Sequence, residues 1–312
     1  MASQEIKPQT LTLAALWLVL LVCHLWGGSM PTIKVSEAGI PPLMTAAGRA
    51  GVGVLLLALF AWFKGEPILM RGRYLWHGVI LGLLFALTML CLYWGLVFTN
   101  ASRGVIFYNT KPFWVAIGAH LFLAGDRLTL IKLIGLILAL LGVYLALESP
   151  APFLGPAHWW GDAMEIAAAL AFSALAVYLK WLSRYPQVTH LHTLFSMMLY
   201  ALPLLILATL LLEWGTPLKL TLVELLAFLY QSVLAGFLAY LLWFWLIHNY
   251  PVSLLASFIF LVPLLGVILS GILLKEPTPK LLWLGLALNV VGIFLVNRPQ
   301  GFNWVKLWHK LI

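Results

Sequence analysis

Ten apolar runs of about 20 residues follow one another along this chain, and each is long enough to cross a bilayer as a helix. They lie at about 11 to 33, 42 to 63, 74 to 97, 102 to 124, 128 to 147, 160 to 181, 190 to 212, 220 to 247, 251 to 274 and 279 to 297. Apolar residues are continuous within each run, whereas a barrel strand would alternate apolar with polar residues. With 63% apolar and 9% charged residues among 312, no stretch remains for a soluble enzyme domain. The sequence therefore predicts an all-α membrane protein with ten transmembrane helices.

The basic residues predict the orientation of these helices. An even number of spans places both termini on one side, whose loops carry 11 basic residues against 5 on the opposite side. The 11 are Lys7, Lys64, Arg71, Arg73, Arg127, Lys132, Lys180, Arg184, Arg298, Lys306 and Lys310, and the 5 are Lys34, Arg103, Lys219, Lys275 and Lys280. Because positively charged loops face the cytoplasm, we expect both termini inside, in the inner (plasma) membrane of a cell. The basic residues form no dense cluster, so the formal charge of +8 indicates no nucleic-acid partner.

The two halves of the chain repeat the same landmarks in the same order. In each half an acid and two glycines are separated by 9 and then 7 residues: Asp126, Gly135 and Gly142, then Glu276, Gly285 and Gly292. A tryptophan, a serine and a proline recur at an offset of 151: Trp94, Ser102 and Pro112, then Trp245, Ser253 and Pro263. We therefore predict two five-helix units, residues 1–150 and 151–301. Residues 302–312 place aromatic and apolar side chains on one helical side, which predicts an amphipathic tail on the membrane surface.

Five is an odd number, so the second unit must enter the membrane from the side opposite to the first. Inverted repeats around a site near the bilayer midplane are typical of secondary transporters, which alternate access to that site. We predict such a transporter, with helix kinks at Pro112 and Pro263. No cofactor is expected, and no metal site, because Cys23 and Cys91 both lie inside apolar runs.

Several motifs carry a family resemblance. In the first half they are Trp26-Gly27-Gly28-Ser29, Lys34, Arg49, Pro112, Gly125-Asp126-Arg127 and GLILALLGVYLAL from Gly135. In the second half they are Pro263, Lys275-Glu276-Pro277 and GLALNVVGIFLV from Gly285. Together they resemble the EamA-type members of the drug/metabolite transporter (DMT) superfamily, although Asp126 replaces the usual Glu and Phe172-Ser173 replaces a Trp-Gly pair. The resemblance implies a transporter and not an enzyme, with a 5+5 inverted repeat that exports amino acids and other small metabolites through a cavity walled by helices 1, 3, 4, 6, 8 and 9.

Lys111 is the charged residue deepest within a run. It lies about nine residues, roughly 13 Å, into that run, directly before Pro112, which lacks a backbone donor and frees a carbonyl one turn earlier. A charge at this depth is costly unless it has a partner or a task. Tyr108 shares its helix face, and Asn109 adds an amide. We predict an anion site with Lys111 as its anchor and Tyr108 and Asn109 as hydrogen-bonding groups; a lysine that snorkels to the surface or pairs with Glu165 is the alternative.

Other residues complete the predicted site. Glu165 would receive the ammonium of a zwitterion or carry a proton, or else serve only as a helix-start residue. Trp26, Tyr240 and Trp243 lie deep in their runs and are expected to form an aromatic wall. Arg49 and Arg103 are additional candidates, although a structural pairing is favoured for Arg49.

These features predict export of a small anionic or zwitterionic metabolite such as an amino acid. A carrier of phosphorylated or nucleotide-linked metabolites is the alternative, and it would need two or three converging basic residues. A cationic drug exporter is disfavoured because acids within the runs are scarce. A membrane-embedded lipid enzyme is disfavoured because no HExxH, GxSxG, P-loop or paired-carboxylate motif occurs. The expected partners are the small-molecule substrate and the lipid bilayer, with the protein a monomer or homodimer.

Overall fold

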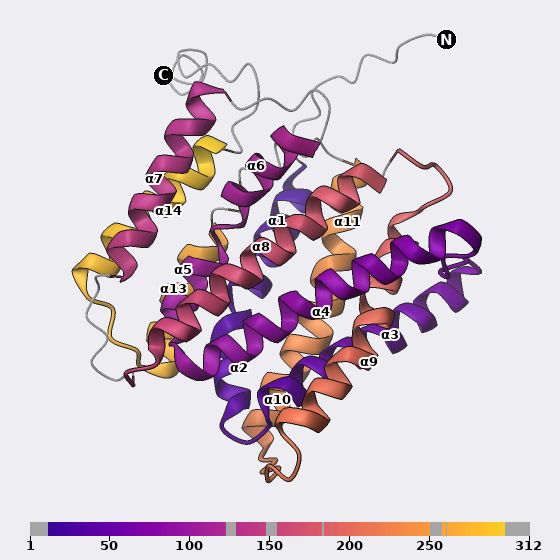
Figure 1. The fold of residues 1–312 in the computed structure, drawn as a ribbon, viewed down its shortest axis with the longest axis horizontal. Helices are drawn as coiled ribbons and strands as arrows, with labels where there is room; N and C mark the ends of the chain where they lie inside the picture. Colours follow the sequence, from indigo (N-terminus) through magenta and orange to yellow (C-terminus); the bar gives the residue numbers. More distant parts are fainter. Residues whose placement is uncertain are drawn as a thin grey trace.

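A computed structural model describes residues 12–122, 129–147, 155–182, 184–249, 258–259 and 261–296, and in these ranges the chain is helical, without strands. Figure 1 shows the helices packed side by side in one bundle. Six helical segments are long and apolar enough to cross a membrane: Leu13–Glu37, Pro42–Lys64, Gly72–Phe98, His158–Leu182, His190–Leu212 and Leu222–Trp243. The prediction of an all-α protein with several membrane spans is therefore confirmed. The tail over 302–312 and the landmarks Asp126 and Ser253 lie outside the described residues.

The helices lie along the apolar runs and extend at most about four residues beyond their ends, and some runs contain more than one helix. In chain order the elements are α1 (Leu13–Gly27), α2 (Ser29–Glu37), α3 (Pro42–Lys64), the 3-10 turn η1 (Gly72–Tyr74), α4 (Leu75–Phe98), α5 (Ala101–Tyr108), α6 (Lys111–Phe122), α7 (Leu130–Leu147), α8 (His158–Leu182), α9 (His190–Leu212), α10 (Leu222–Leu229), the π-helix η2 (Tyr230–Leu238), α11 (Ala239–Asn249), α13 (Leu261–Leu274) and α14 (Lys280–Val296). The runs that begin near 11, 102 and 220 are each divided between successive helical elements. A π-helix inside a membrane-spanning segment is rare and often lies at a functional site.

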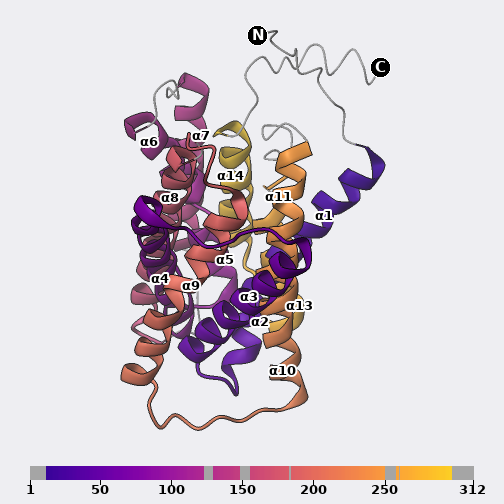
Figure 2. The ribbon, with the colours of Figure 1, turned by 90° about the vertical axis from the view of Figure 1, so that its right-hand side faces the viewer.

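Helices that are distant in sequence pack along one another. Figures 1 and 2 show α7 beside α14, and α4 packs against both α8 and α9. The backbones of α7 and α14 touch, because a Cβ added at Gly142 would lie 2.5 Å from the Gly285 carbonyl oxygen. In the same way, a Cβ at Gly292 would lie 2.5 Å from the Gly135 carbonyl oxygen. The glycines that the sequence repeats are thus the residues that let these two helices approach closely.

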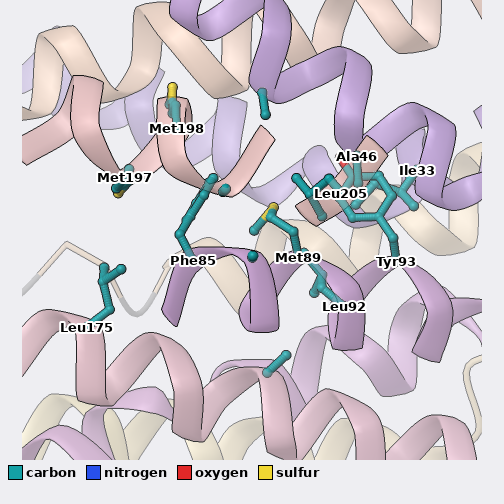
Figure 3. Packing of buried hydrophobic residues seen from close by; sticks show 14 of the residues in the cluster. Ile33, Ala46, Phe85, Met89, Leu92, Tyr93, Leu175, Met197, Met198 and Leu205 are labelled. Atoms are coloured by element: carbon teal, nitrogen blue, oxygen red, sulfur yellow. The ribbon is translucent and has the colours of Figure 1, made fainter. Parts of the chain in front are cut away.

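The largest apolar cluster lies around α4. Phe85, Met89 and Tyr93 of α4 are buried in the same cluster as Met197 and Met198 of α9, and Figure 3 shows these side chains together. A smaller cluster joins α1 to α11 and α13. The helices are therefore held by packing on their inner faces, and many large apolar side chains remain on the outer faces, as the lipid contact of a membrane protein requires.

Two glutamates cap helix N-termini from distant loops. Glu213 accepts hydrogen bonds at 2.8 and 2.9 Å from the backbone N–H groups of the two residues that follow Pro42 in α3. Glu276 accepts bonds of 2.8 and 2.9 Å from the N–H groups of Ala101 and Ser102 in α5. Carboxylates are favoured at these positions by the unpaired N–H groups and the helix dipole. Burial raises the pKa of the Glu213 carboxyl, and its two backbone hydrogen bonds act against that rise.

Candidate functional site

The polar stretch from Tyr108 to Lys111 forms a break between two helices. α5 ends at Tyr108, α6 begins at Lys111, and Asn109 and Thr110 form the turn between them. The interruption expected beside Pro112 is therefore present, and it places the proline in the first turn of α6, where a missing N–H costs little. Pro263 likewise lies in the first turn of α13, and residues 250–257 and 260, which precede that helix, are outside the described part of the chain.

The ammonium of Lys111 lies against two aromatic faces. Its Nζ atom is 3.6 Å from the centre of the Tyr108 ring and 5.0 Å from that of Phe172 in α8. The aromatic faces partly compensate the charge, since a desolvated cation–π contact stabilises by about 2 kcal/mol. The side chain is only half-buried. Lys111 is thus held inside the protein without a hydrogen-bonded acid in the described residues, as an anion anchor would be.

Asn109 does not join this group. Its side chain is buried, and its amide donates a 2.7 Å hydrogen bond to the carbonyl oxygen of Val105, one turn earlier in α5. Thr110 bonds to the carbonyl of Phe107 in the same way, at 2.7 Å. Both side chains therefore satisfy the end of α5 and shape the break, which is the local competition with helix hydrogen bonds expected of such residues.

Glu165 presents a buried carboxylate without a hydrogen-bond donor. The residue is fully buried in α8, and within the described residues neither of its oxygens has a hydrogen-bond partner. Two glycines make room for it, because a Cβ at Gly95 or Gly104 would lie 3.3 or 3.5 Å from Glu165 Oε1. Lys111 interacts with it electrostatically. A buried carboxylate in this state needs a proton or a cationic ligand.

Three aromatic residues form a wall from α1 and α11. The ring of Trp26 packs edge-on at 5.5 Å against Tyr240 and at 5.5 Å against Trp243. All three side chains are half-buried. The same surface continues toward the helix break, because Tyr240 and Tyr108 pack against the same apolar cluster. The structure thus brings together the predicted aromatic wall and the predicted anchor region.

Arg49 also reaches this region, from α3. It is buried, and its Nη1 donates a 3.3 Å hydrogen bond to the hydroxyl of Tyr93, which donates at 2.8 Å to Oε1 of Gln231 in the π-helix. Its guanidinium also lies near the hydroxyls of Tyr108 and Tyr240. Reasoning from sequence did not find Gln231 or Tyr93. The sequence does offer a signal that could have identified Gln231, because it is the one amide side chain in the apolar run from 220 to 247.

Arg103 is located elsewhere. Its Nη2 lies 2.6 Å from Oδ2 of Asp162, and its Nε donates at 3.3 Å to the other oxygen of that carboxylate. Both side chains are 3% exposed. Thr99 adds a 2.7 Å bond to Asp162. This buried, two-point ion pair between α5 and α8 occupies the guanidinium, so Arg103 does not converge with Arg49 and Lys111.

The arrangement defines a class of protein. Interrupted membrane helices that bring charged and aromatic side chains into the interior are typical of membrane transporters. No group of three or more metal-ligating side chains occurs among the described residues. The chain belongs to the EamA-like transporter family, whose model matches residues 13–147 and again residues 159–298. It is therefore a multi-pass membrane protein of a transporter family, and not an enzyme, as the sequence predicted.

Relatives agree with this assignment. The chain is 30% identical to the uncharacterized transporter YvbV of Bacillus subtilis over 94% of this chain and 93% of that protein. It is 27% identical to a probable amino-acid metabolite efflux pump of Escherichia coli over 93% and 96% of the two chains. A solved crystal structure matches with a TM-score of 0.67 at 19% identity, covering 96% of this chain and 98% of the other, which shows a shared fold.

Proposed function

We propose that this protein is a secondary transporter that exports small anionic or zwitterionic metabolites, of which amino acids are the best fit. It works in the inner (plasma) membrane with both termini in the cytoplasm, by alternating access to a central site. The observation that carries the proposal is the position of Lys111, whose ammonium lies half-buried at a helix break within range of the unpartnered Glu165 carboxylate. The efflux-pump name of the Escherichia coli relative supports the substrate class.

The proposed architecture is ten helices in two inverted five-helix repeats, over 1–150 and 151–301. The family model matches the chain twice, once in each half, which supports a duplication. Packing supports it as well: Gly142 and Gly292 touch the backbone carbonyls of Gly285 and Gly135, and each residue of one contact lies 150 positions from its equivalent in the other. Two related halves of opposite orientation can exchange conformations, which is what alternating access requires.

The proposed substrate lies between the helix break and the aromatic wall. Lys111 binds its acid group, and Tyr108 adds a hydroxyl. An ammonium would be received by Glu165 or by the faces of Trp26, Tyr240 and Trp243, since cations bind over aromatic rings. Asn109 contributes by holding the end of α5 at the break.

Transport by purified protein in proteoliposomes tests the proposal. Lys111→Ala should reduce uptake of amino-acid substrates by at least about tenfold, since a hydrogen bond to a charged group contributes roughly 1.5–3 kcal/mol. Lys64→Ala is the matched control, because Lys64 is an exposed lysine at the end of α3. If the Lys111 variant is folded and still carries every anionic and zwitterionic candidate at the normal rate, the anchor does not exist.

One observation favours a second candidate function. A carrier of phosphorylated or nucleotide-linked metabolites needs converging basic residues, and Arg49 lies near the same tyrosines as Lys111. Arg103 supplies no third charge, because Asp162 binds it. Inclusion of sugar phosphates and nucleotides in the same uptake panel distinguishes the two functions.

A further inference from the structure

Among the described residues, one buried basic side chain is left without a paired acid. The basic residues that reach a neighbouring helix are Lys34, Arg49, Arg103 and Lys111. The acids that do so are Glu37, Asp162 and Glu165, together with Glu213 and Glu276, whose carboxylates bind the N-termini of α3 and α5. Lys34 Nζ lies 3.2 Å from Glu37 Oε2. Asp162 binds Arg103, and Glu165 interacts with Lys111. Arg49 is left with a tyrosine hydroxyl as its hydrogen-bond partner and with no acid in the described part of the chain.

The surroundings of Arg49 suit an acidic ligand. A guanidinium has five N–H donors, and a single 3.3 Å bond to Tyr93 uses one of them. The hydroxyls of Tyr108 and Tyr240 lie within electrostatic range, and neither has a hydrogen-bond partner among the described residues. Gly236 of the π-helix gives the guanidinium room, since a Cβ there would lie 3.2 Å from Arg49 Nε. The Arg49 guanidinium and the two tyrosine hydroxyls thus offer N–H and O–H donors without acceptors, and such a group can bind a carboxylate.

Tyr108 joins this donor group to the Lys111 site. Its ring lies beneath the Lys111 ammonium, while its hydroxyl lies near Arg49. Glu165 completes the group, because it lies near both Lys111 and Tyr108. The site therefore brings two basic side chains and one acidic side chain together around one aromatic ring. With all three side chains ionised, the group would carry one positive charge, which a low-dielectric interior tolerates best when a ligand neutralises it.

We propose that the cargo is an acidic amino acid, with two carboxylates and one ammonium. The side-chain carboxylate binds Arg49 with the tyrosine hydroxyls, the α-carboxylate binds Lys111, and the α-ammonium binds Glu165. This assignment rests on the proposed function and narrows its substrate class. A neutral amino acid would leave one positive charge without a partner, and an acid without an ammonium would leave Glu165 without one, so neither satisfies all three groups.

The test compares two substrates of nearly equal size and shape in proteoliposomes. Wild-type protein should transport L-glutamate with an apparent affinity about ten- to a hundredfold better than L-glutamine, the range expected for one charge-assisted contact. Arg49→Gln should bring this ratio close to one, and Arg49→Lys should keep part of it. The ratio compares glutamate with glutamine in the same sample, and only folded protein transports either one. A lower yield of folded variant therefore does not change the ratio. Lys64→Gln is the exposed control and should leave the ratio unchanged.

Three other results would each contradict a specific part of the proposal. A ratio near one in the wild type, or a ratio that Arg49→Gln leaves unchanged, refutes the acidic amino acid while export of amino acids stands. Transport of succinate as good as that of glutamate refutes the ammonium contact with Glu165. If the wild type transports none of the amino acids, the proposed function itself fails.

Discussion

The ion pair between Arg103 and Asp162 offers a sharp test of which charges build the fold and which bind cargo. Both side chains are almost completely buried, and their guanidinium and carboxylate meet at 2.6 Å. Removing one partner of such a pair leaves an uncompensated buried charge, which costs about 3–5 kcal/mol. Arg103→Met should therefore destabilise the protein by this amount, because the remaining 2.7 Å bond from Thr99 cannot neutralise the Asp162 carboxylate.

The double variant Arg103→Met with Asp162→Leu should recover most of that loss. Replacing a whole buried pair by apolar side chains of similar size is often nearly neutral, within about 1–2 kcal/mol of the native protein. Thermal unfolding of the detergent-solubilised protein measures the effect. At about 2–4 °C for each kcal/mol in a chain of 150–250 residues, the single variant should melt roughly 10 °C lower and the double variant close to wild type.

Transport by the same variants separates a structural pair from a substrate contact. If Arg103 only holds α5 against α8, the double variant should transport normally once it is folded. The reasoning is refuted if the single variant melts at the wild-type temperature. It is equally refuted if the double variant melts normally but no longer transports, since Arg103 would then act on the cargo.

Two further predictions concern the packing of the helices. Gly142→Ala and Gly292→Ala should each lower stability by about 1–3 kcal/mol, because the new Cβ would lie 2.5 Å from a backbone oxygen across the α7 and α14 interface. Gly51→Ala is their control: its nearest neighbour would be 3.8 Å away, so it should be neutral or gain up to about 1 kcal/mol in thermal melting. Glu276→Ala should cost about 1–3 kcal/mol, because the N–H groups that begin α5 lose their acceptors, and it should also weaken ligand binding measured by thermal shift.

The sequence predicted the helical class and the repeated glycines for one physical reason. A long apolar run must form a helix in a bilayer, whatever the rest of the chain does. Small residues at a regular spacing allow close packing of that helix. The apolar runs and the glycine intervals of 9 and 7 residues were therefore sufficient to predict both features. The break before Pro112 was predictable in the same way, because proline restricts its own helix. Trp26, Tyr240 and Trp243 were expected together because they lie far from the interface where such residues normally occur, and their rings are in contact; their role as a wall of the site stays a prediction.

The sequence could not predict which charges meet. Arg49 lies nearer the end of its apolar run than Lys111 does, and nothing in its spacing shows that it reaches Tyr93 in α4 and the π-helix beyond. Arg103 looked like a second anion ligand until the fold placed Asp162 beside it. Pairings of this kind join residues 44 or more positions apart, so they depend on tertiary packing that local patterns do not encode.

The short helix α5 connects the loop that carries Glu276 to the proposed site. α5 has 8 residues and is roughly 12 Å long, with Glu276 bound at its first amides and Tyr108 at its last position. Glu276 follows α13 in the chain, so a shift of that helix relative to α4 would pull the N-terminus of α5 and carry the Tyr108 ring with it. The same ring supports Lys111, and its hydroxyl lies near Arg49. A short, separately capped helix can therefore transmit movement between the Glu276 loop and both proposed anion contacts, which a continuous helix packed along its whole length would resist.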